Sequence, residues 1–315
     1  MTAPTKAPAK KRAPRKRVTT PTPDGRTRLI RRGRGHSYEL DGAWCPGVTT
    51  IIKGAVPMPA LIGWAGRTVA EWTMDRLMVN GEHVLADELI NDLRAFNERE
   101  KKPEKLGSGF SRVGLSKVLS KVMYAERDEA ADRGTEVHSI AARIAAGEEV
   151  EVPEPLERHV DSYLRFLEEW EPTDAILEGV VINRRWRYMG RFDLIADLPR
   201  YTLRDGTTWG GRTLLDLKTG HSGPFGEDAL QLAGYRYGET MLDGDGNEVP
   251  MPEVESTGIL HVRADGYDLY PFVADEAVHR VFLYCAQVYK ALDWKGDGLV
   301  AHARGDALRP PKEFA

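Results

Sequence analysis

Four side chains that could take part in chemistry lie close together in residues 214–239, whose sequence is LLDLKTGHSGPFGEDALQLAGYRYGE. Asp216 and Lys218 fall two apart in an apolar run typical of a strand, so both face one side, about 6.6 Å apart by strand rise. Gln231 and Tyr235 fall four apart in a helical pattern and share one helix face. Each pair is common by itself. A surface ion pair and a core tyrosine beside a surface glutamine would explain them equally well.

A second carboxylate makes the first pair more informative. Asp193 lies in another predicted strand, 23 residues before Asp216. This gap is long enough for the two residues to meet across a hairpin. Two adjacent carboxylates repel, and a divalent cation held by oxygen ligands keeps both ionised at low cost. We therefore expect a Mg²⁺ site, at which Mn²⁺ can substitute. Lys218 beside it would orient water or neutralise charge during phosphodiester hydrolysis.

A histidine upstream fits the same picture. His138 lies in a helical pattern with small residues at Gly134, Ala141 and Ala145. Small residues let a helix approach a sheet closely, which would bring the imidazole to the metal. A histidine with a purely structural role fits this pattern equally well.

Composition restricts the class of protein. The 315 residues are 41% apolar and 29% charged, in the range of globular proteins, and no apolar run approaches the ~18 residues of a membrane span. The amino-terminal residues do not resemble a secretory signal, so we expect a cytoplasmic protein. Cys45 and Cys285 are the only cysteines, too few for an iron–sulfur cluster. Any metal must then be bound through oxygen or nitrogen.

Positive charge is concentrated at the amino terminus. Residues 1–34 hold 12 of the 44 Lys and Arg residues and one of the 48 Asp and Glu residues, so this part carries about +11 and the remainder about −15. We expect residues 1–23 to be a disordered basic tail that contacts nucleic acid, a solubilising leader or a localisation signal. A second basic segment is expected to grip phosphates, although a solvated helix face is an equal alternative for each cation. Its cations are Lys101, Lys102, Lys105, Arg112, Lys117 and Lys121.

The order of patterns predicts an α/β fold. A strand pair at 26–32 and 36–42 and a β-branched strand at 45–54 precede helices at 59–79, 82–96, 111–123, 126–146 and 156–169. Strands at 175–186, 187–198 and 212–220, a helix at 227–242, a hairpin at 257–273 and a helix at 275–294 capped by Asp275 follow. We expect a mixed sheet flanked by helices, with a helical N-terminal region over 24–150, a core over 151–300 and a tail over 301–315.

Four motifs in order resemble the PD-(D/E)XK nuclease superfamily, and within it the RecB-type and bacteriophage exonucleases. The motifs are Gly134-Thr-Glu-Val-His138, Gly190-Arg-Phe-Asp193, Asp216-Leu-Lys218 and Gln231-Leu-Ala-Gly-Tyr235. The resemblance implies a restriction-endonuclease-like mixed central sheet. It makes Asp193 and Asp216 metal ligands, Lys218 the catalytic lysine, and Gln231 with Tyr235 the helix motif that follows the core strands. A glutamine amide can bond a phosphate or a base edge and a tyrosine can stack on a base or bond a phosphate, so we expect Gln231 and Tyr235 to contact DNA.

The resemblance implies further ligands as well. His138 and the main-chain carbonyl of Leu217 would also approach the metal, and Glu178 is similar to an extra acid of some relatives. Many relatives carry four cysteines for an iron–sulfur cluster, which this chain lacks.

We therefore expect a Mg²⁺-dependent DNA exonuclease of phage DNA recombination or processing, with DNA as substrate. A single-strand-annealing or other recombination protein is a candidate partner, and the oligomeric state stays open. An endonuclease or flap nuclease with the same site, an inactive DNA-binding accessory protein and a scaffold that uses the basic tail are the alternatives. Strand polarity and the preference for single or double strands are not predicted.

Overall fold

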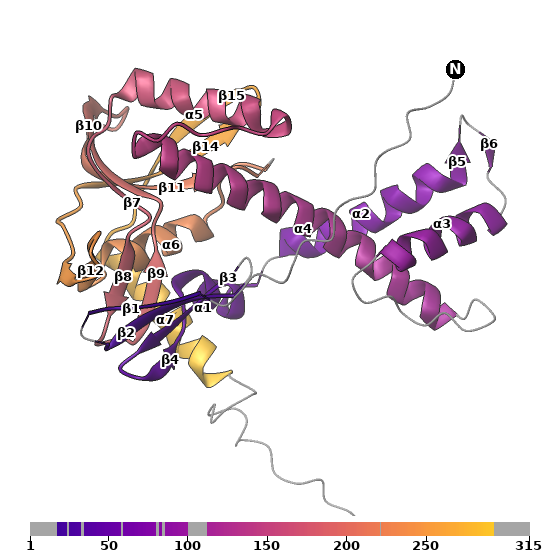
Figure 1. Cartoon of the computed structure of the whole chain (residues 1–315), viewed down its shortest axis with the longest axis horizontal. Helices are drawn as coiled ribbons and strands as arrows, with labels where there is room; N and C mark the ends of the chain where they lie inside the picture. Colours follow the sequence, from indigo (N-terminus) through magenta and orange to yellow (C-terminus); the bar gives the residue numbers. More distant parts are fainter. Residues whose placement is uncertain are drawn as a thin grey trace, which may run out of the picture.

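The computed structural model describes residues 18–23, 25–32, 35–57, 59–79, 82–83, 86–99, 112–220 and 222–292. Figure 1 shows a body of sheets and helices, from which the long helix α4 (Arg112–Ala145) extends to a group of helices away from the sheets. This confirms the predicted α/β class with a mixed sheet flanked by helices. The expected tail over 301–315 and the lysines Lys101, Lys102 and Lys105 lie outside the described residues.

A five-stranded sheet of order β15-β14-β11-β10-β7 forms the centre of the body. β11 and β14 are parallel, whereas the other neighbours are antiparallel. The parallel pair requires a crossover, and α6 (Glu227–Arg236) lies in it. The strands are β7 (Thr173–Leu177), β10 (Leu194–Thr202), β11 (Thr208–Lys218), β14 (Ser256–Arg263) and β15 (Gly266–Phe272). The hairpin predicted over 257–273 is confirmed as β14 and β15.

Helices cover both faces of this sheet. Helix α5 (Glu157–Trp170), preceded by the 3₁₀ turn η1 (Glu154–Leu156), packs on one face. Helices α1 (Val48–Ala55), α6 and α7 (Glu276–Ala291) cover the other face. Side chains alternate along β11, so Leu215 and Leu217 join the core under α5, while Leu214 joins the core under α6. Leu215 and Leu217 therefore point away from the face that carries Asp216.

A long hairpin bends from this sheet into a second one of order β13-β12-β8-β9. The predicted single strands at 175–186 and 187–198 are therefore wrong, because each is two strands. The backbone N–H of Glu178 donates to the carbonyl of Asp193 (3.0 Å), and that of Phe192 to Gly179 (3.0 Å), so pairing continues through the bend. A Cβ at position 179 would lie 2.2 Å from the buried Phe192 ring, which explains the glycine. The strands are β8 (Val180–Asn183), β9 (Tyr188–Arg191), β12 (Thr240–Leu242) and β13 (Glu248–Pro250).

The amino-terminal part begins with a four-stranded antiparallel sheet of order β1-β2-β3-β4. Its strands are β1 (Val18–Pro21), β2 (Thr27–Arg32), β3 (Gly35–Leu40) and β4 (Ala43–Cys45). The predicted strand pair is confirmed as β2 and β3. The boundary of the disordered tail at residue 23 is wrong, since residues 18–21 pair with β2. Residues 1–17 lie outside the described part.

The β-branched strand predicted over 45–54 is also wrong, because this segment forms α1. Val48, Ile51 and Ile52 are buried at helical spacing. Burial of this face against α6 and α7 overrides the strand preference of β-branched residues.

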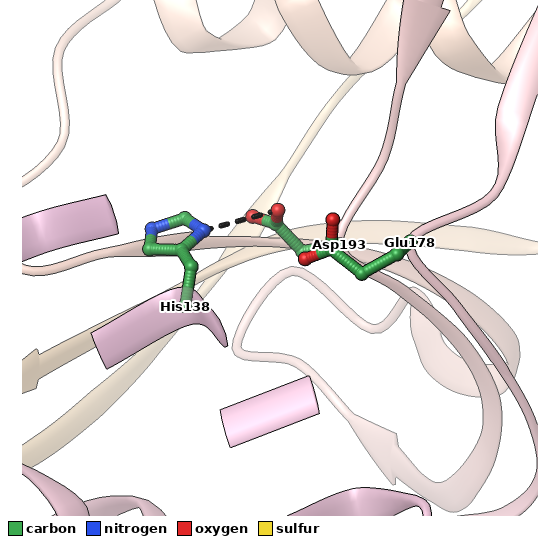
Figure 2. A group of neighbouring side chains, drawn as sticks. All are labelled: His138, Glu178 and Asp193. Carbon is green, nitrogen blue, oxygen red and sulfur yellow. Dashed lines mark hydrogen bonds and ion pairs between the residues drawn. The ribbon is translucent and has the colours of Figure 1, made fainter. Parts of the chain in front are cut away.

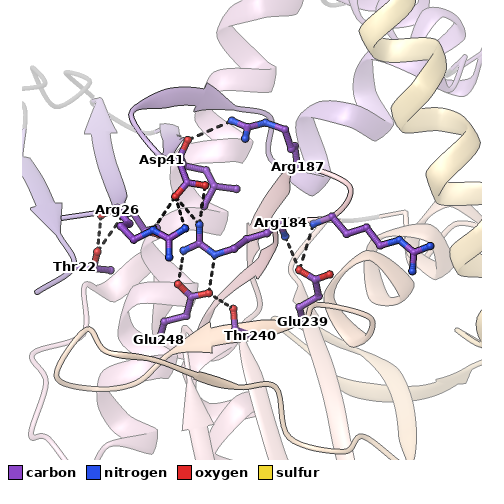
Figure 3. Close-up of polar contacts among 11 residues, drawn as sticks. Thr22, Arg26, Asp41, Arg184, Arg187, Glu239, Thr240 and Glu248 are labelled. Carbon is purple, nitrogen blue, oxygen red and sulfur yellow. Dashed lines mark hydrogen bonds and ion pairs between the residues drawn. The ribbon is translucent and has the colours of Figure 1, made fainter. Parts of the chain in front are cut away.

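An ion-pair network joins the amino-terminal sheet to the second sheet (Figure 3). The Arg184 guanidinium donates to both carboxylate oxygens of Asp41 (2.8 and 2.9 Å) and also binds Glu248. Asp41 accepts a further hydrogen bond from Arg26 (3.0 Å). Residues from three distant parts of the chain are thereby held at one corner of the body.

The helical region consists of α2 (Pro59–Leu77), α3 (Ala86–Arg99) and the first half of α4, with the short strands β5 (Met78–Val79) and β6 (Glu82–His83). The helices predicted over 111–123 and 126–146 are one helix of 34 residues, since no glycine or proline interrupts the sequence between them. α4 therefore connects the helical region to the central sheet (Figure 1). No helix in the described part of the chain has the length and apolarity needed to cross a membrane.

Two predicted helices of the core differ in extent from the observed ones. The helix predicted over 227–242 ends at Arg236, because residues 240–242 turn away to form β12. The closing helix α7 begins as predicted, with the Asp275 carboxylate accepting a hydrogen bond from the Val278 N–H (3.0 Å). It ends at Ala291.

Candidate active site

The two aspartates expected to act together are neighbours in the central sheet. Asp193 lies at the bend between β9 and β10, and Leu194 pairs with Leu215, so Asp193 comes next to Asp216 on the adjoining strand. The Asp193 carboxylate accepts a hydrogen bond from the Leu217 backbone N–H through Oδ2 (2.7 Å). The register of a simple hairpin thus brings together two residues 23 positions apart.

His138, Glu178 and Asp193 form a compact group of potential metal ligands (Figure 2). One ligand atom from each lies within 4.8 Å of the others. The Nδ1 atom of His138 and Oδ1 of Asp193 are 3.1 Å apart, and Figure 2 shows the two side chains pointing toward one another. Opposite ligands of one Mg²⁺ ion, each about 2.1 Å from it, are about 4.2 Å apart. Small side-chain movements would therefore let all three bind one ion.

A cavity of about 20 Å³ adjoins this group. Such a volume accepts about one water molecule or a particle of similar size. Its lining is mostly alanine and leucine, Leu217 among them, and its polar members are His138, Tyr163, Glu178 and Asp193. The donor set of His138, Glu178 and Asp193 fits a single metal ion.

Small residues in the sequence of α4 let this helix lie close to the central sheet. A Cβ at Gly134 would lie 3.0 Å from the Thr219 hydroxyl, just beyond the end of β11, and Ala141 is buried in the core under α5. Small residues on α4 thus allow His138 to reach the sheet. This agrees with the interpretation of His138 as a residue of the site.

Glu178 is held by a residue that the sequence interpretation did not single out. Glu178 has a left-handed backbone conformation (φ +53°) at the bend between β7 and β8. Its carboxylate forms an ion pair with Arg191 at 2.7 Å. Both side chains are about three-quarters buried. Arg191 belongs to the Gly190-Arg-Phe-Asp193 motif, so its position in that motif was the available signal.

A second polar group centres on Lys218. Its ammonium group lies 2.8 Å from Oδ2 of Asp216 and 3.2 Å from Oδ1 of Asp228. Asp228 is buried and also accepts a hydrogen bond from the Phe225 N–H (2.8 Å). The sequence interpretation missed Asp228, although it lies three residues before Gln231 and hence on the same helix face.

The Gln231 amide links the members of this group. Its Nε2 donates to Asp216 (2.6 Å) and to the Tyr235 hydroxyl (3.1 Å), and its Oε1 accepts from Lys218 (3.1 Å). Two amide hydrogens and one carbonyl lone pair are thereby used inside the protein. In this structure Gln231 therefore positions Asp216 and Lys218, which differs from the expected contact with DNA.

The expected contact of Tyr235 with DNA requires a larger correction. Tyr235 is only 3% exposed, so its ring cannot stack on a base. A Cβ at Gly190 would lie 2.6 Å from this ring, and one at Gly234 would lie 2.9 Å from Val48. The two glycines make room for close packing around α6.

The environment of the site shifts the pKa values of Asp193 and Asp216 in opposite directions. Burial tends to raise the pKa of Asp193, but the positive charge of His138 and the hydrogen bonds from His138 and Leu217 hold it below its usual range. Burial and the charge of Asp193 raise the pKa of Asp216 to about 6, against the opposing charge of Lys218. One of the two carboxylates is thus firmly ionised and the other takes up a proton more easily.

The two cations of the site respond to the same carboxylates. Burial lowers the pKa of His138, but the charge of Asp193 and the hydrogen bond to it raise the value to about 9. Burial likewise disfavours the Lys218 cation, yet Asp216 and Asp228 raise its pKa above the usual range. Without a bound metal, both side chains are therefore positively charged at neutral pH.

The described cations of the predicted DNA-gripping segment lie on α4, far from His138. Lys117 and Lys121 come 21 and 17 residues before it, which at 1.5 Å per residue is about 25–32 Å along the helix. Lys121 donates to Oδ1 of Asn97 on α3 (3.0 Å). Arg112 is the first residue of α4. These three positions belong to the helical region, whereas the catalytic candidates belong to the sheet.

Comparisons with known proteins do not assign the chain to a family. No family model matches the chain, and no curated protein matches it. A solved structure described as the crystal structure of SSO0001 is 16% identical, with a TM-score of 0.24, over 42% of this chain and 55% of that chain. The chain thus spans about half the length of that protein. A likeness this weak carries no argument, so function must be inferred from the site itself.

Proposed function

We propose that this protein is a metal-dependent deoxyribonuclease that hydrolyses DNA phosphodiester bonds. The observation that carries the proposal is the close grouping of His138, Glu178 and Asp193 as potential metal ligands, with Asp216 and Lys218 on the adjoining strand. A cation site next to a partly buried lysine suits a reaction in which negative charge develops on a phosphate.

The residues present fit a divalent cation. Asp193, Glu178 and His138 would hold it, with Asp216 and the Leu217 carbonyl as the further ligands that the resemblance implies. Carboxylates favour Mg²⁺ and Mn²⁺, and an imidazole favours the transition metals, so we propose Mg²⁺ with Mn²⁺ as a substitute. When bound, such an ion polarises a phosphate oxygen and lowers the pKa of water.

Lys218 has a defined role in this proposal. Asp216 and Asp228 keep its ammonium group protonated, so it does not act as a base at neutral pH. It instead provides positive charge next to the reacting phosphate and orients a water molecule through its N–H groups. Gln231 holds the lysine and Asp216 together, and Tyr235 holds Gln231.

The finer assignment rests on the motif resemblance. We propose an exonuclease of phage DNA recombination or processing that acts in the host cytoplasm, with a single-strand-annealing or other recombination protein as a candidate partner. An endonuclease, a flap nuclease and an inactive DNA-binding accessory protein are the competing assignments.

Digestion of linear and covalently closed circular double-stranded DNA with Mg²⁺ or EDTA tests the proposal. We expect linear DNA to be degraded only with Mg²⁺, and Asp193→Asn and Lys218→Ala to stop degradation. Asp197→Asn is the matched control, because it neutralises a more exposed carboxylate on β10 that pairs with Arg212. Cleavage of circles would favour an endonuclease. DNA binding without cleavage under any divalent metal would favour the accessory protein, and cleavage by both site variants would refute the site.

A further inference from the structure

A groove at the junction of β4, the β8–β9 turn and α7 has a chemistry that the proposed active site does not use. Its volume is about 440 Å³, within the ~300–1,000 Å³ range of cavities that take a ligand of nucleotide size. Aromatic and cationic side chains meet there from three elements. They are Trp44, Trp186, Tyr289, Arg185, Arg187 and Lys290, and we call them the aromatic groove.

The two tryptophan rings of the groove are presented to solvent. Trp44 is 54% exposed and Trp186 is 41% exposed, which is unusual for the largest apolar side chain. Trp44 and Tyr289 stand with ring centroids 6.5 Å apart and planes tilted by 38°. Exposed aromatic faces that converge in this way are available for stacking on a planar ligand.

Close packing and hydrogen bonds to the backbone hold the rings of the aromatic groove in place. A Cβ at Gly54 of α1 would lie 2.4 Å from the Tyr289 ring, so the glycine lets this ring lie directly on the helix. The Pro46 carbonyl accepts the Met189 N–H (3.1 Å), which joins the segment after Trp44 to β9. The Trp186 backbone N–H donates to the Asn183 side chain (2.9 Å) and fixes the β8–β9 turn.

The charges of the groove select an anion. Arg185, Arg187 and Lys290 are exposed, and the described lining residues include no carboxylate. The Arg185 guanidinium lies 5.5 Å from the centroid of the Trp186 ring, so one cation already stacks on an aromatic face. The ligand should therefore combine flat aromatic groups with negative charge.

We propose that the aromatic groove binds single-stranded DNA, with unpaired bases stacked on Trp44 and Trp186 and phosphates paired with Arg187 and Lys290. Single strands combine π-faces and a charged backbone, and proteins bind them through this combination of rings and cations. In a duplex the base faces are stacked on each other and out of reach. This inference rests on the proposed nuclease function for its choice of DNA.

The location of the groove indicates what it would do for the enzyme. Arg187 directly precedes β9 and Asp193 lies at the bend that follows it, six residues later, so at about 3.3 Å per residue the two positions are at most about 20 Å apart. The groove is thus separate from the proposed site of cleavage but within reach of the same DNA strand. The groove would hold an unpaired strand of a partly processed DNA end without contributing to bond breakage.

Fluorescence anisotropy with a labelled thymidine oligonucleotide of about 12 nucleotides, in EDTA so that nothing is cleaved, tests the inference. We expect Trp186→Ala to weaken binding about tenfold, which corresponds to the loss of one stacked base. Tyr201→Ala is the matched control, since Tyr201 is 48% exposed on β10 and does not line the groove. It should leave binding unchanged.

Salt dependence provides an independent measurement of the phosphate contact. Lys290→Ala should reduce the slope of log affinity against log salt by about 0.7, the value for one phosphate of a single strand. Arg280→Ala removes a cation from the same helix that is paired with Glu276 and does not line the groove, so the slope should not change. Thermal unfolding of each variant checks that the fold is retained.

The outcomes separate the groove from the active site. Oligonucleotide affinity that is equal in wild type, Trp186→Ala and Lys290→Ala overturns the inference, even if the protein cleaves DNA. A synthetic peptide of residues 293–315 would then be the first alternative occupant to test. Loss of binding in these variants, in a protein that cleaves nothing with any metal, would support the groove and refute the nuclease.

Discussion

Replacing Asp193 with asparagine in the metal-free protein should convert His138 from a stable cation into an ordinary histidine. Asparagine keeps the shape and the acceptor for the Leu217 N–H, so the substitution removes mainly the charge. The pKa of His138 should then fall from about 9 toward its ordinary value of 6.5, because the charge of Asp193 and the hydrogen bond to it, the two largest effects that oppose burial, are removed. At about 1.4 kcal/mol per pH unit, this difference corresponds to about 3 kcal/mol.

The same pair makes the stability of the metal-free protein depend on pH. The folded pKa of His138 exceeds the unfolded value, so its stabilising contribution is complete below pH 6.5 and is lost as the pH rises through 9. The free energy of unfolding of Asp193→Asn should lie about 3 kcal/mol below that of the wild type near pH 6. The gap should narrow above pH 9.

An NMR titration of the histidine ring protons in EDTA measures the pKa directly, and urea unfolding at the two ends of this pH range measures the stability. Asp197→Asn is again the control, and the His138 signal should titrate as in the wild type. A wild-type His138 that titrates near 6.5, or a stability gap that is the same at both pH values, would refute the reasoning.

Four further substitutions test other parts of the site. Gln231→Leu should lower the cleavage rate at saturating Mg²⁺ by about 10–100-fold, as expected for a residue that orients ligands, and Tyr235→Phe should cost less because it removes only one partner of the amide. His138→Ala should weaken Mn²⁺ binding more than Mg²⁺ binding in calorimetry, since an imidazole favours the transition metal; equal losses would argue that His138 is not a ligand. Gly234→Ala should destabilise the protein in urea by about 1–2 kcal/mol, because a Cβ 2.9 Å from the buried Val48 costs more than the ~1 kcal/mol gain in helix propensity. Gly66→Ala, where a Cβ meets nothing within 4 Å, should stabilise and serves as its control.

Local patterns in the sequence determined much of the core. Alternation along β11 placed Asp216 and Lys218 on one face, the two strand patterns on either side of the turn at residues 264–265 set the β14–β15 hairpin, and Asp275 began α7. Each of these features depends on neighbours within a few residues. Such interactions are encoded in the order of residue types and can be predicted without the rest of the fold.

Other elements depended on contacts with distant parts of the chain. The β-branched residues of α1 form a helix because α6 and α7 bury its apolar face. The strands around residues 179 and 192 divide because Phe192 occupies the space over Gly179 and turns the hairpin into a second sheet. Pattern alone could not predict either outcome, since the alternative strand satisfied the same local preferences.

The candidate site shows the same division between sequence and tertiary structure. The sequence supplied Asp193, Asp216, Lys218 and His138 as residue types able to bind a metal or a phosphate. Only the fold joined Glu178 and His138 to Asp193 around one cavity, buried Tyr235, and made Gln231 a link between Asp216 and Lys218. The physical reason is that burial and ligand geometry depend on which elements pack together, and packing is a property of the whole chain.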